Sequence, residues 1–196
     1  TVIVRRPEAG AVGSNWWHNY EVSLQVVDDE RVLLTAFGYA QLFTGKQGKF
    51  TSTSALGHTL TRLSDGTWRW LRNGADGAPV QGVTTLDAEG RATRWEDPSG
   101  RSLSSEYDAG GRLLAITDQS GYETALAYEG ERIAGVTDAA GSTWTLEYSD
   151  DDLVAIVDPL EAGWVLGYDD AHGLTTKTDP LGFTTGYRYE ADGQLV

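Results

Sequence analysis

The chain has 196 residues, a formal net charge of −14 and no cysteine. This acidic balance excludes nucleic-acid binding as a main function, because that requires a basic face, and it argues against binding to anionic membrane surfaces. The lack of cysteine excludes disulfides and thiol chemistry, and no run approaches the roughly 18 apolar residues of a membrane span, so no membrane insertion by this segment is expected. The 24 Gly, 7 Trp and 9 Tyr suit turns and strands and favour an all-β fold.

Residues 1–75 are predicted to form an irregular, β-rich segment. A short apolar strand, Val2 to Val4, is followed by a loop from Gly10 to Ser14. Asp28 to Glu30 lies between two alternating runs and predicts a hairpin turn. Asp65-Gly66 between apolar runs predicts another, because this dipeptide favours tight turns between strands.

From residue 76 to residue 196 one pattern recurs about every 20 residues. Each unit opens with Asp and carries Tyr ten residues later, and both the Asp-to-Asp and the Tyr-to-Tyr steps are 21, 20, 20 and 21 residues. A weaker copy from Asp76 to Leu86 has Leu in the Tyr place, and the last unit is truncated. The predicted structural repeat residues are Asp97, Tyr107, Gly111, Asp118, Tyr128, Asp138, Tyr148, Asp158, Tyr168, Asp179 and Tyr189.

Each unit is predicted to be a β-hairpin. In the first arm apolar residues alternate, as in Trp144, Leu146 and Tyr148, which is typical of a half-buried strand. The second arm carries apolar residues an odd number apart, such as Leu113 and Ile116. Either a bulge intervenes or this arm is covered on both faces.

Two kinds of turn join these arms. The opening turns read Asp-x-x-Gly, in which Asp bonds its own backbone and Gly suits the last position. Glu161 stands in the Gly place of the fourth copy, so that turn is expected to differ in detail. The turn after each Tyr varies by one residue between copies, which accounts for the steps of 20 and 21 residues.

The pattern Asp-Pro-x-Gly, six residues, Tyr-Asp-x-x-Gly-Arg-Leu resembles the YD repeat of Rhs (rearrangement hotspot) proteins. Tyr107 to Leu113 is the nearest copy, while Tyr168 to Leu174 and Tyr189 to Leu195 are looser. Gly13 to Trp16 and Asp65 to Trp70 resemble motifs that precede the repeats there. Known members include bacterial polymorphic toxins, C components of insecticidal toxin complexes, wall-associated proteins and animal teneurins.

This resemblance implies an architecture and a role. Tandem hairpins would form a coiling antiparallel sheet, part of a hollow cocoon-like shell started by residues 1–75, that encapsulates a C-terminal toxin or effector domain before delivery. The implied partners are the enclosed toxin domain and further shell repeats, on the same chain or on separate chains of an oligomer. The implied location is secreted or at the cell surface, as for a bacterial effector. Because Val196 falls just as a second arm begins, we expect a piece of a longer assembly.

No catalytic, cofactor or metal residues are predicted. Paired carboxylates could serve glycoside hydrolysis, but five equivalent Asp positions favour turn chemistry, because catalysis needs one pair in unlike environments. Asp150 to Asp152 lacks the alternating ligands of a calcium loop, and His18, His58 and His172 show no metal-ligand spacing. The alternative function is an adhesin or carbohydrate-binding module, which would use exposed aromatic rings that the period-two pattern instead assigns to packing.

Overall fold

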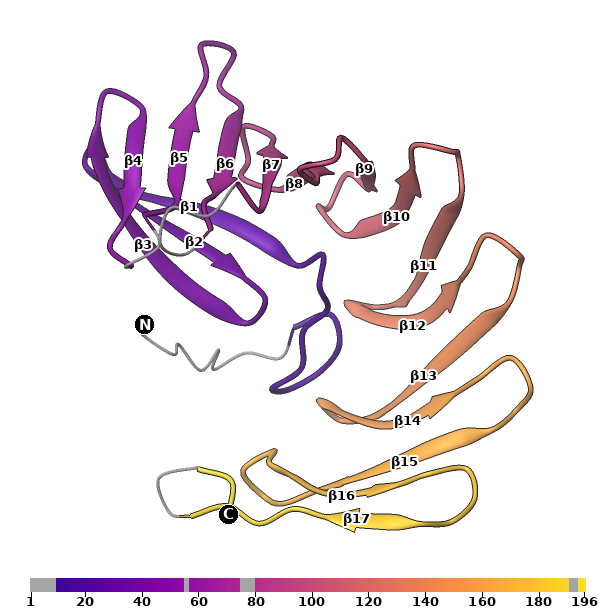
Figure 1. Cartoon of the computed structure of the whole chain (residues 1–196). Coiled ribbons are helices and arrows are strands. Elements are labelled where there is room, and N and C mark those ends of the chain that lie inside the picture. Colours follow the sequence, from indigo (N-terminus) through magenta and orange to yellow (C-terminus); the bar gives the residue numbers. More distant parts are fainter. Residues whose placement is uncertain (1–9, 55–56, 75–79, 191–193) are drawn as a thin grey trace. The chain divides into compact units, whose positions relative to one another are not determined.

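The computed structural model describes residues 10–54, 57–74, 80–190 and 194–196. These residues form 17 strands and no helix, and every strand pairing among them is antiparallel, which confirms the predicted all-β class (Figure 1). Of the predicted features, the strand at 2–4, Asp76 and the turn residues 191–193 lie outside the described residues. The described chain divides into two compact units, which we call the first unit (18–123) and the second unit (10–17 and 124–196).

The first unit contains ten strands, and each pairs with the next one along the chain. The hairpin turns predicted at Asp28 to Glu30 and at Asp65-Gly66 join β1 to β2 and β5 to β6, and both are confirmed. The strands are β1 (Val22–Asp28), β2 (Arg31–Ala36), β3 (Tyr39–Lys46), β4 (Lys49–Ser52), β5 (Thr59–Arg62), β6 (Trp68–Arg72), β7 (Gly82–Leu86), β8 (Ala92–Glu96), β9 (Ser102–Tyr107) and β10 (Leu113–Asp118).

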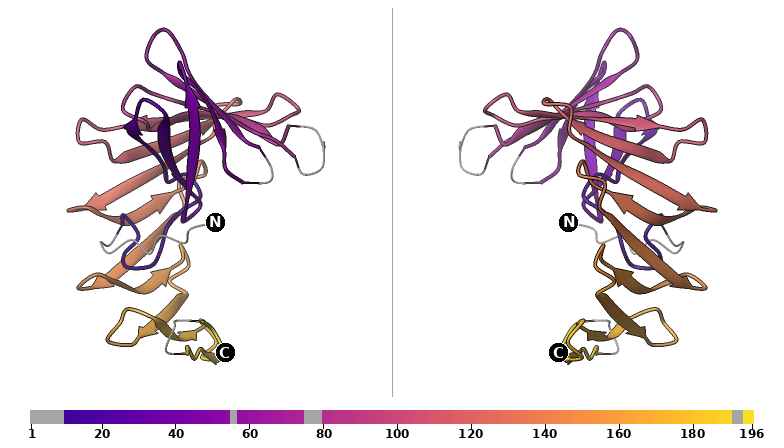
Figure 2. Two further views of the ribbon diagram at one scale, coloured as in Figure 1. Left: turned by 90° about the vertical axis from the view of Figure 1, so that its left-hand side faces the viewer. Right: turned by 90° about the vertical axis from the view of Figure 1, so that its right-hand side faces the viewer.

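The second unit is a ladder of hairpins in which consecutive strands pair, seen from two sides in Figure 2. Its strands are β11 (Glu123–Glu129), β12 (Arg132–Thr137), β13 (Thr143–Ser149), β14 (Asp152–Val157), β15 (Gly163–Tyr168), β16 (Leu174–Thr178) and β17 (Thr184–Gly186). The tandem hairpins predicted from the 20-residue period are therefore present. Each turn joins strands that are neighbours in both sequence and space.

A bulge in the second arm of each hairpin settles the question left open by its apolar pattern. Leu113 pairs with Tyr107 but Ala115 pairs with Glu106, so one extra residue, Leu114, is inserted at this point. Leu113 and Ile116 consequently face the same side, although their spacing is odd, and both are buried. The same register shift recurs after Ala92, Ile133, Leu153 and Leu174.

The bulges align one apolar face along the second unit. Tyr148 pairs with Leu153, and Leu146 with Ile156, so all four side chains lie on one side of the sheet. The next pairing, Ile156 with Trp164, continues that face into β15. A single half-buried face therefore runs across the hairpins.

Candidate functional site: tyrosine clamps and a crossing segment

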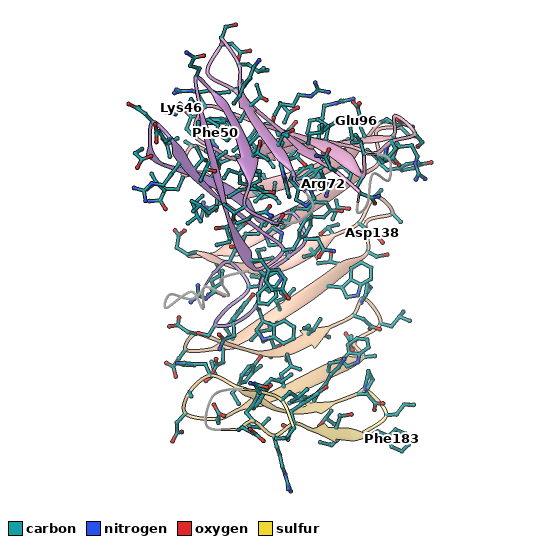
Figure 3. The ribbon with its side chains drawn as sticks, turned by 60° about the vertical axis from the view of Figure 1, so that its left-hand side comes forward. Lys46, Phe50, Arg72, Glu96, Asp138 and Phe183 are labelled. Atoms are coloured by element: carbon teal, nitrogen blue, oxygen red, sulfur yellow. The ribbon has the colours of Figure 1, made fainter. Side chains whose placement is uncertain are left out.

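Each repeat aspartate organises the turn that opens its unit. In Asp138 the carboxylate Oδ1 accepts hydrogen bonds from the backbone N–H groups of Ala140 (2.9 Å) and Ser142 (2.9 Å). The backbone N–H of Asp138 in turn donates to the carbonyl of Ser142 (2.9 Å), so the turn is closed on both sides. Asp138 lies at a hairpin tip at the edge of the second unit (Figure 3). Equivalent bonds are made by Asp97, Asp118, Asp158 and Asp179.

The fourth turn, with Glu161 in the Gly place, was predicted to differ, and that prediction is wrong. Glu161 adopts φ 65°, in the left-handed region where Gly141 (φ 84°) and Gly182 (φ 88°) also lie. Its N–H donates to the carbonyl of Asp158 at 3.0 Å, as the Gly does in the other copies. The hydrogen bonds of Asp158 thus hold the turn in its common shape, and Glu161 accepts a conformation that disfavours side chains.

The carboxylate of Asp97 is adapted to accept hydrogen bonds. The Ser99 hydroxyl donates to it at 2.6 Å and the Arg101 Nε at 2.8 Å, and these bonds lower the Asp97 pKa to about 2. A carboxyl group with so low a pKa is ionised at neutral pH and does not act as a general acid.

Three repeat tyrosines fasten one hairpin to the hairpin before it. The hydroxyl of Tyr148 donates to the carbonyl of Ile133 at 2.9 Å, and that of Tyr168 donates to the carbonyl of Leu153 at 2.7 Å. Tyr107 makes the same bond to Ala92 at 2.8 Å, and the separation is 15 residues in all three cases. We call these bonds the tyrosine clamps.

The clamps act at the bulges. Ile133 and Leu153 are the last regularly paired residues before the register shifts, where the bulge disrupts the ladder of backbone bonds. A phenol hydroxyl supplies the donor that such a partly buried carbonyl requires. Burial raises the pKa of Tyr148 to about 12 and also raises the pKa of Tyr107 and Tyr168, so these phenols remain donors at neutral pH.

The other repeat residues lie at corresponding places. Tyr128 lies opposite Ile133 near the end of β11, and Tyr189 forms an isolated bridge with Leu195. Gly111 has φ 89° and donates its N–H to the carbonyl of Asp108 in the turn after Tyr107. Tyr107 pairs with Leu113, six residues later, whereas Tyr128 pairs with Ile133, five residues later. The one-residue difference in length between these units therefore lies in this turn.

Residues 10–17, which we call the crossing segment, contact the turn ends of successive hairpins in the second unit. The Ala11 carbonyl accepts from the Ile133 N–H (2.8 Å), and the Ser14 N–H donates to the Asp151 carbonyl (2.7 Å). Asn15 Nδ2 then donates to the carbonyl of His172 (2.9 Å). The segment therefore ties together three hairpins that follow one another at the repeat period.

Side chains of the crossing segment extend this connection. Trp16 Nε1 donates to the Tyr168 hydroxyl at 2.8 Å, which links the segment to a tyrosine clamp. Gly13 has φ 94°, and a Cβ on it would lie 2.8 Å from the Asp151 carbonyl oxygen. Only Gly fits this position, because both the conformation and the close approach exclude a side chain.

Sequence analysis placed Gly10 to Ser14 in a loop and missed its contacts with hairpins more than 100 residues later. Gly13, shortly before Trp16 and Trp17, was the one local sign in the sequence that the backbone has an unusual conformation here. Beside the segment, Trp16, Trp17, Tyr168, His172 and Tyr189 line a cavity of about 620 Å³. Its rings are the aromatic residues that the alternative, carbohydrate-binding interpretation required.

The histidines do not converge. His172 Nδ1 lies 2.9 Å from Asp152 Oδ1 in the second unit, whereas His58 accepts a bond from the Asn73 N–H in the first. Burial lowers the pKa of His18. Among the described residues, no group of three or more His, Cys, Asp or Glu side chains could hold a metal ion. In that same part of the chain, no helix is long and apolar enough to cross a membrane.

Part of the chain is similar to a known protein family. A family model described as RHS Repeat matches residues 87–123, 107–142 and 168–196. Among solved structures, one described as TcdB2-TccC3-Cdc42 is similar with 13% identity and a TM-score of 0.47, covering 85% of this chain and 11% of that chain. The structures described as TcdB2-TccC3 and TcdB2-TccC3-TEV are similar with 12% and 13% identity and a TM-score of 0.35 each, also over 85% of this chain.

The chain spans only 11% to 15% of the length of these solved chains. No curated protein sequence matches it. Similarity at this level of identity does not extend to activity or partners.

Proposed function

We propose that this chain, whose repeats match the RHS Repeat family model, is part of a hairpin-built shell that encloses and protects a toxin or effector domain before delivery. In this proposal residues 1–75 start the shell and residues 76–196 are repeat wall. The partners are further shell repeats, on this chain or on others, and the enclosed domain. The location is extracellular or at the cell surface, and this piece has a containing role without catalysis.

The observation that carries the proposal is the way one hairpin fastens to the next. Strand pairing joins consecutive hairpins, and at Tyr148 and Tyr168 a tyrosine clamp to the residue 15 positions earlier joins the hairpin to its predecessor. A unit of this kind cannot bury its own face alone, but it extends a wall each time it is repeated. Such a wall suits containment, because it shields an enclosed chain from solvent and proteases.

The proposal is tested on the native particle that contains this chain. We expect native mass spectrometry to give a mass far above 21.2 kDa and to reveal a co-purifying domain. That domain should resist protease in the intact particle and be cut once the particle is unfolded. A lone 21.2 kDa monomer, or a co-purifying domain that is cut equally fast in both conditions, contradicts containment.

A second candidate is the carbohydrate-binding module, which the aromatic cavity beside the crossing segment favours. Trp17 is 47% exposed and Tyr189 39% exposed at this cavity, so their rings are accessible for stacking on a sugar. Titration calorimetry with neutral oligosaccharides tests it. Trp17→Ala should abolish binding, whereas Tyr122→Ala, which alters a 68% exposed ring outside the cavity, should not. Equal loss in both variants, or no binding at all, removes this candidate.

A further inference from the structure

A second cavity, of about 790 Å³, lies in the first unit. Its walls are largely apolar, with Leu34, Phe37 and Leu42 contributed by β2, β3 and the turn between them. His58, Trp70 and Arg72 add nitrogen groups from the region of β5 and β6. A mostly apolar cavity with a few polar groups is the usual form of a small-molecule site.

Two residues that line this cavity each carry a buried donor with no acceptor among the described residues. Trp70 is only 4% exposed, and its Nε1 is fully buried without a hydrogen-bond partner among the described residues. The Nε of Arg72 is in the same condition. Unsatisfied buried donors are costly and rare, and a pair of them at one cavity indicates an acceptor supplied from outside.

No carboxylate among the described residues forms an ion pair with Arg72, and its guanidinium carbon lies 5.3 Å from the centre of the Trp70 ring. Burial lowers the pKa of Arg72, which shows that its charge is partly withdrawn from water. Figure 3 shows Arg72 within the strands of the first unit. The protein therefore holds one partly desolvated positive charge at this cavity.

His58 does not add a second charge. Its Nδ1 accepts a hydrogen bond from the Asn73 N–H at 3.0 Å, so the neutral ring carries its proton on Nε2. Burial, and then the nearby Arg72 charge, lower the His58 pKa, which keeps the ring neutral at pH 7. One cation and neutral N–H donors suit a monoanion, whereas a phosphate or sulfate dianion would remain half neutralised.

The turn between β2 and β3 brings the Phe37 ring to the cavity. Phe37 has φ 53° and Gly38 φ 74°, the same values as Gln47 and Gly48 in the next turn, and a two-residue hairpin turn of type I′ requires positive φ at both positions. In this position the Phe37 ring lies 6.5 Å from the Trp70 ring, centre to centre.

We propose that this cavity binds an apolar monocarboxylate, such as a medium-chain fatty acid. The carboxylate accepts hydrogen bonds from Arg72 and Trp70, and the hydrocarbon lies against Leu34, Phe37 and Leu42. The chain as a whole carries a charge of −14, so an anion is not drawn to it by net charge. Binding depends on these particular donors, and it is independent of the shell function.

The experiment uses the 196-residue chain, labelled with ¹⁵N, and octanoate as the probe. We expect octanoate to shift the indole N–H resonance of Trp70, which the Trp70→Phe variant identifies by its disappearance. Octanol, which lacks the charge, should bind at least about tenfold more weakly, because a charge-assisted hydrogen bond is lost. Acetate, which lacks the hydrocarbon, should bind at least about 100-fold more weakly.

Arg72→Gln should weaken octanoate binding at least about tenfold, because it removes the charge-assisted bonds. Arg69→Gln is the matched control: it makes the same change on the same strand, at an exposed residue that does not line the cavity. Unchanged binding in Arg69→Gln with weakened binding in Arg72→Gln supports the proposal. Octanol binding as tightly as octanoate, an unaffected Arg72→Gln variant, or no shift of the Trp70 resonance overturns it.

Discussion

The two units are stabilised in different ways, although both are built from antiparallel hairpins. Of the seven largest fully buried side chains, six lie in the first unit and only Leu153 in the second. In the second unit the first-arm strands β11 and β13 contain only half-buried and exposed residues, and β17 is fully exposed. The first unit thus has an ordinary hydrophobic core. The second has little such core, and its hairpins are held by bulges, Asp turns and clamps, which the last strands of the first unit also carry.

The largest effect is expected in the core of the first unit. Phe43 is 0% exposed, and Phe43→Ala should lower the free energy of unfolding by about 3–5 kcal/mol, through lost burial and the cavity left behind. Urea unfolding followed by tryptophan fluorescence measures this loss. Leu160→Ala, at an 88% exposed position in the second unit, is the control and should change it by less than about 0.5 kcal/mol. Similar losses of unfolding free energy in both variants would mean that the burial of a side chain does not determine its contribution to stability here.

The next effect is expected in the crossing segment. Gly13→Ala places a Cβ 2.8 Å from the Asp151 carbonyl oxygen at φ 94°, and should cost about 2–3 kcal/mol. Hydrogen exchange of the Ile133 N–H, which donates to the Ala11 carbonyl, should accelerate as the segment detaches. Gly141→Ala has a similar φ of 84° but open space around it, and should cost only about 1 kcal/mol. If both variants lower the free energy of unfolding by the same amount, the close approach of the Asp151 carbonyl oxygen to Gly13 does not contribute to the loss.

Removing a tyrosine clamp should have a moderate effect that depends on pH. Tyr148→Phe loses the bond to the Ile133 carbonyl and should cost about 1–2 kcal/mol at pH 7. The folded pKa of Tyr148, about 12, exceeds its ordinary value of 10.0, so its contribution is complete below pH 10 and is lost as the pH rises to about 12. Urea unfolding at several pH values should therefore show a smaller alkaline loss in Tyr148→Phe. Tyr122→Phe, in an exposed ring, should retain the wild-type pH profile.

A small stabilisation is expected at Glu161. Glu161→Gly relieves the left-handed conformation at φ 65° and should raise the free energy of unfolding by about 0.5–1 kcal/mol. Thermal unfolding measures the gain. Glu161→Ala removes the same carboxylate without freeing the backbone, so a gain of equal size in Ala would assign the effect to charge instead.

The smallest effect concerns one turn carboxylate. Ser99→Ala removes the largest cause of the low Asp97 pKa and should move it upward from about 2 towards 3.8. The pKa lies below its ordinary value, so the stabilisation by the ionised form is present above pH 3.8 and is lost as the pH falls through about 2. NMR titration of the Asp97 carboxyl carbon measures both values. A titration midpoint near 3.8 in the unaltered chain would contradict the assignment.

The sequence predicted the hairpins well because their period and alternation are local. The prediction that the one-residue variation in length lies in the turn after Tyr107 is confirmed. An extra residue within a regular strand would instead move the following side chains to the other face of the sheet. The sequence did not choose between a bulge and double coverage for Leu113 and Ile116, because that depends on the facing strand. It was wrong about Glu161, since the hydrogen bonds of Asp158 outweigh the preference for Gly.

The remaining features are tertiary. The partner of the Tyr148 hydroxyl is a backbone carbonyl, which no side-chain pattern records. The cavity at Trp70 is lined by Phe37 from the turn of another hairpin, which no local pattern relates to Trp70. Neither feature has a sequence motif, so each could be recognised only in the folded structure.

The 15-residue reach of the tyrosine clamp bears on how such chains evolve. The hairpin of Tyr148 and Leu153 carries both parts of the clamp: a hydroxyl that donates backwards and a carbonyl that accepts from the hairpin ahead. Genetic duplication or deletion of one such whole unit therefore leaves the clamp tyrosines with an acceptor. Duplicating a fraction of a unit separates donor from acceptor and moves the bulge out of register. Selection should consequently change the length of these arrays in whole hairpins.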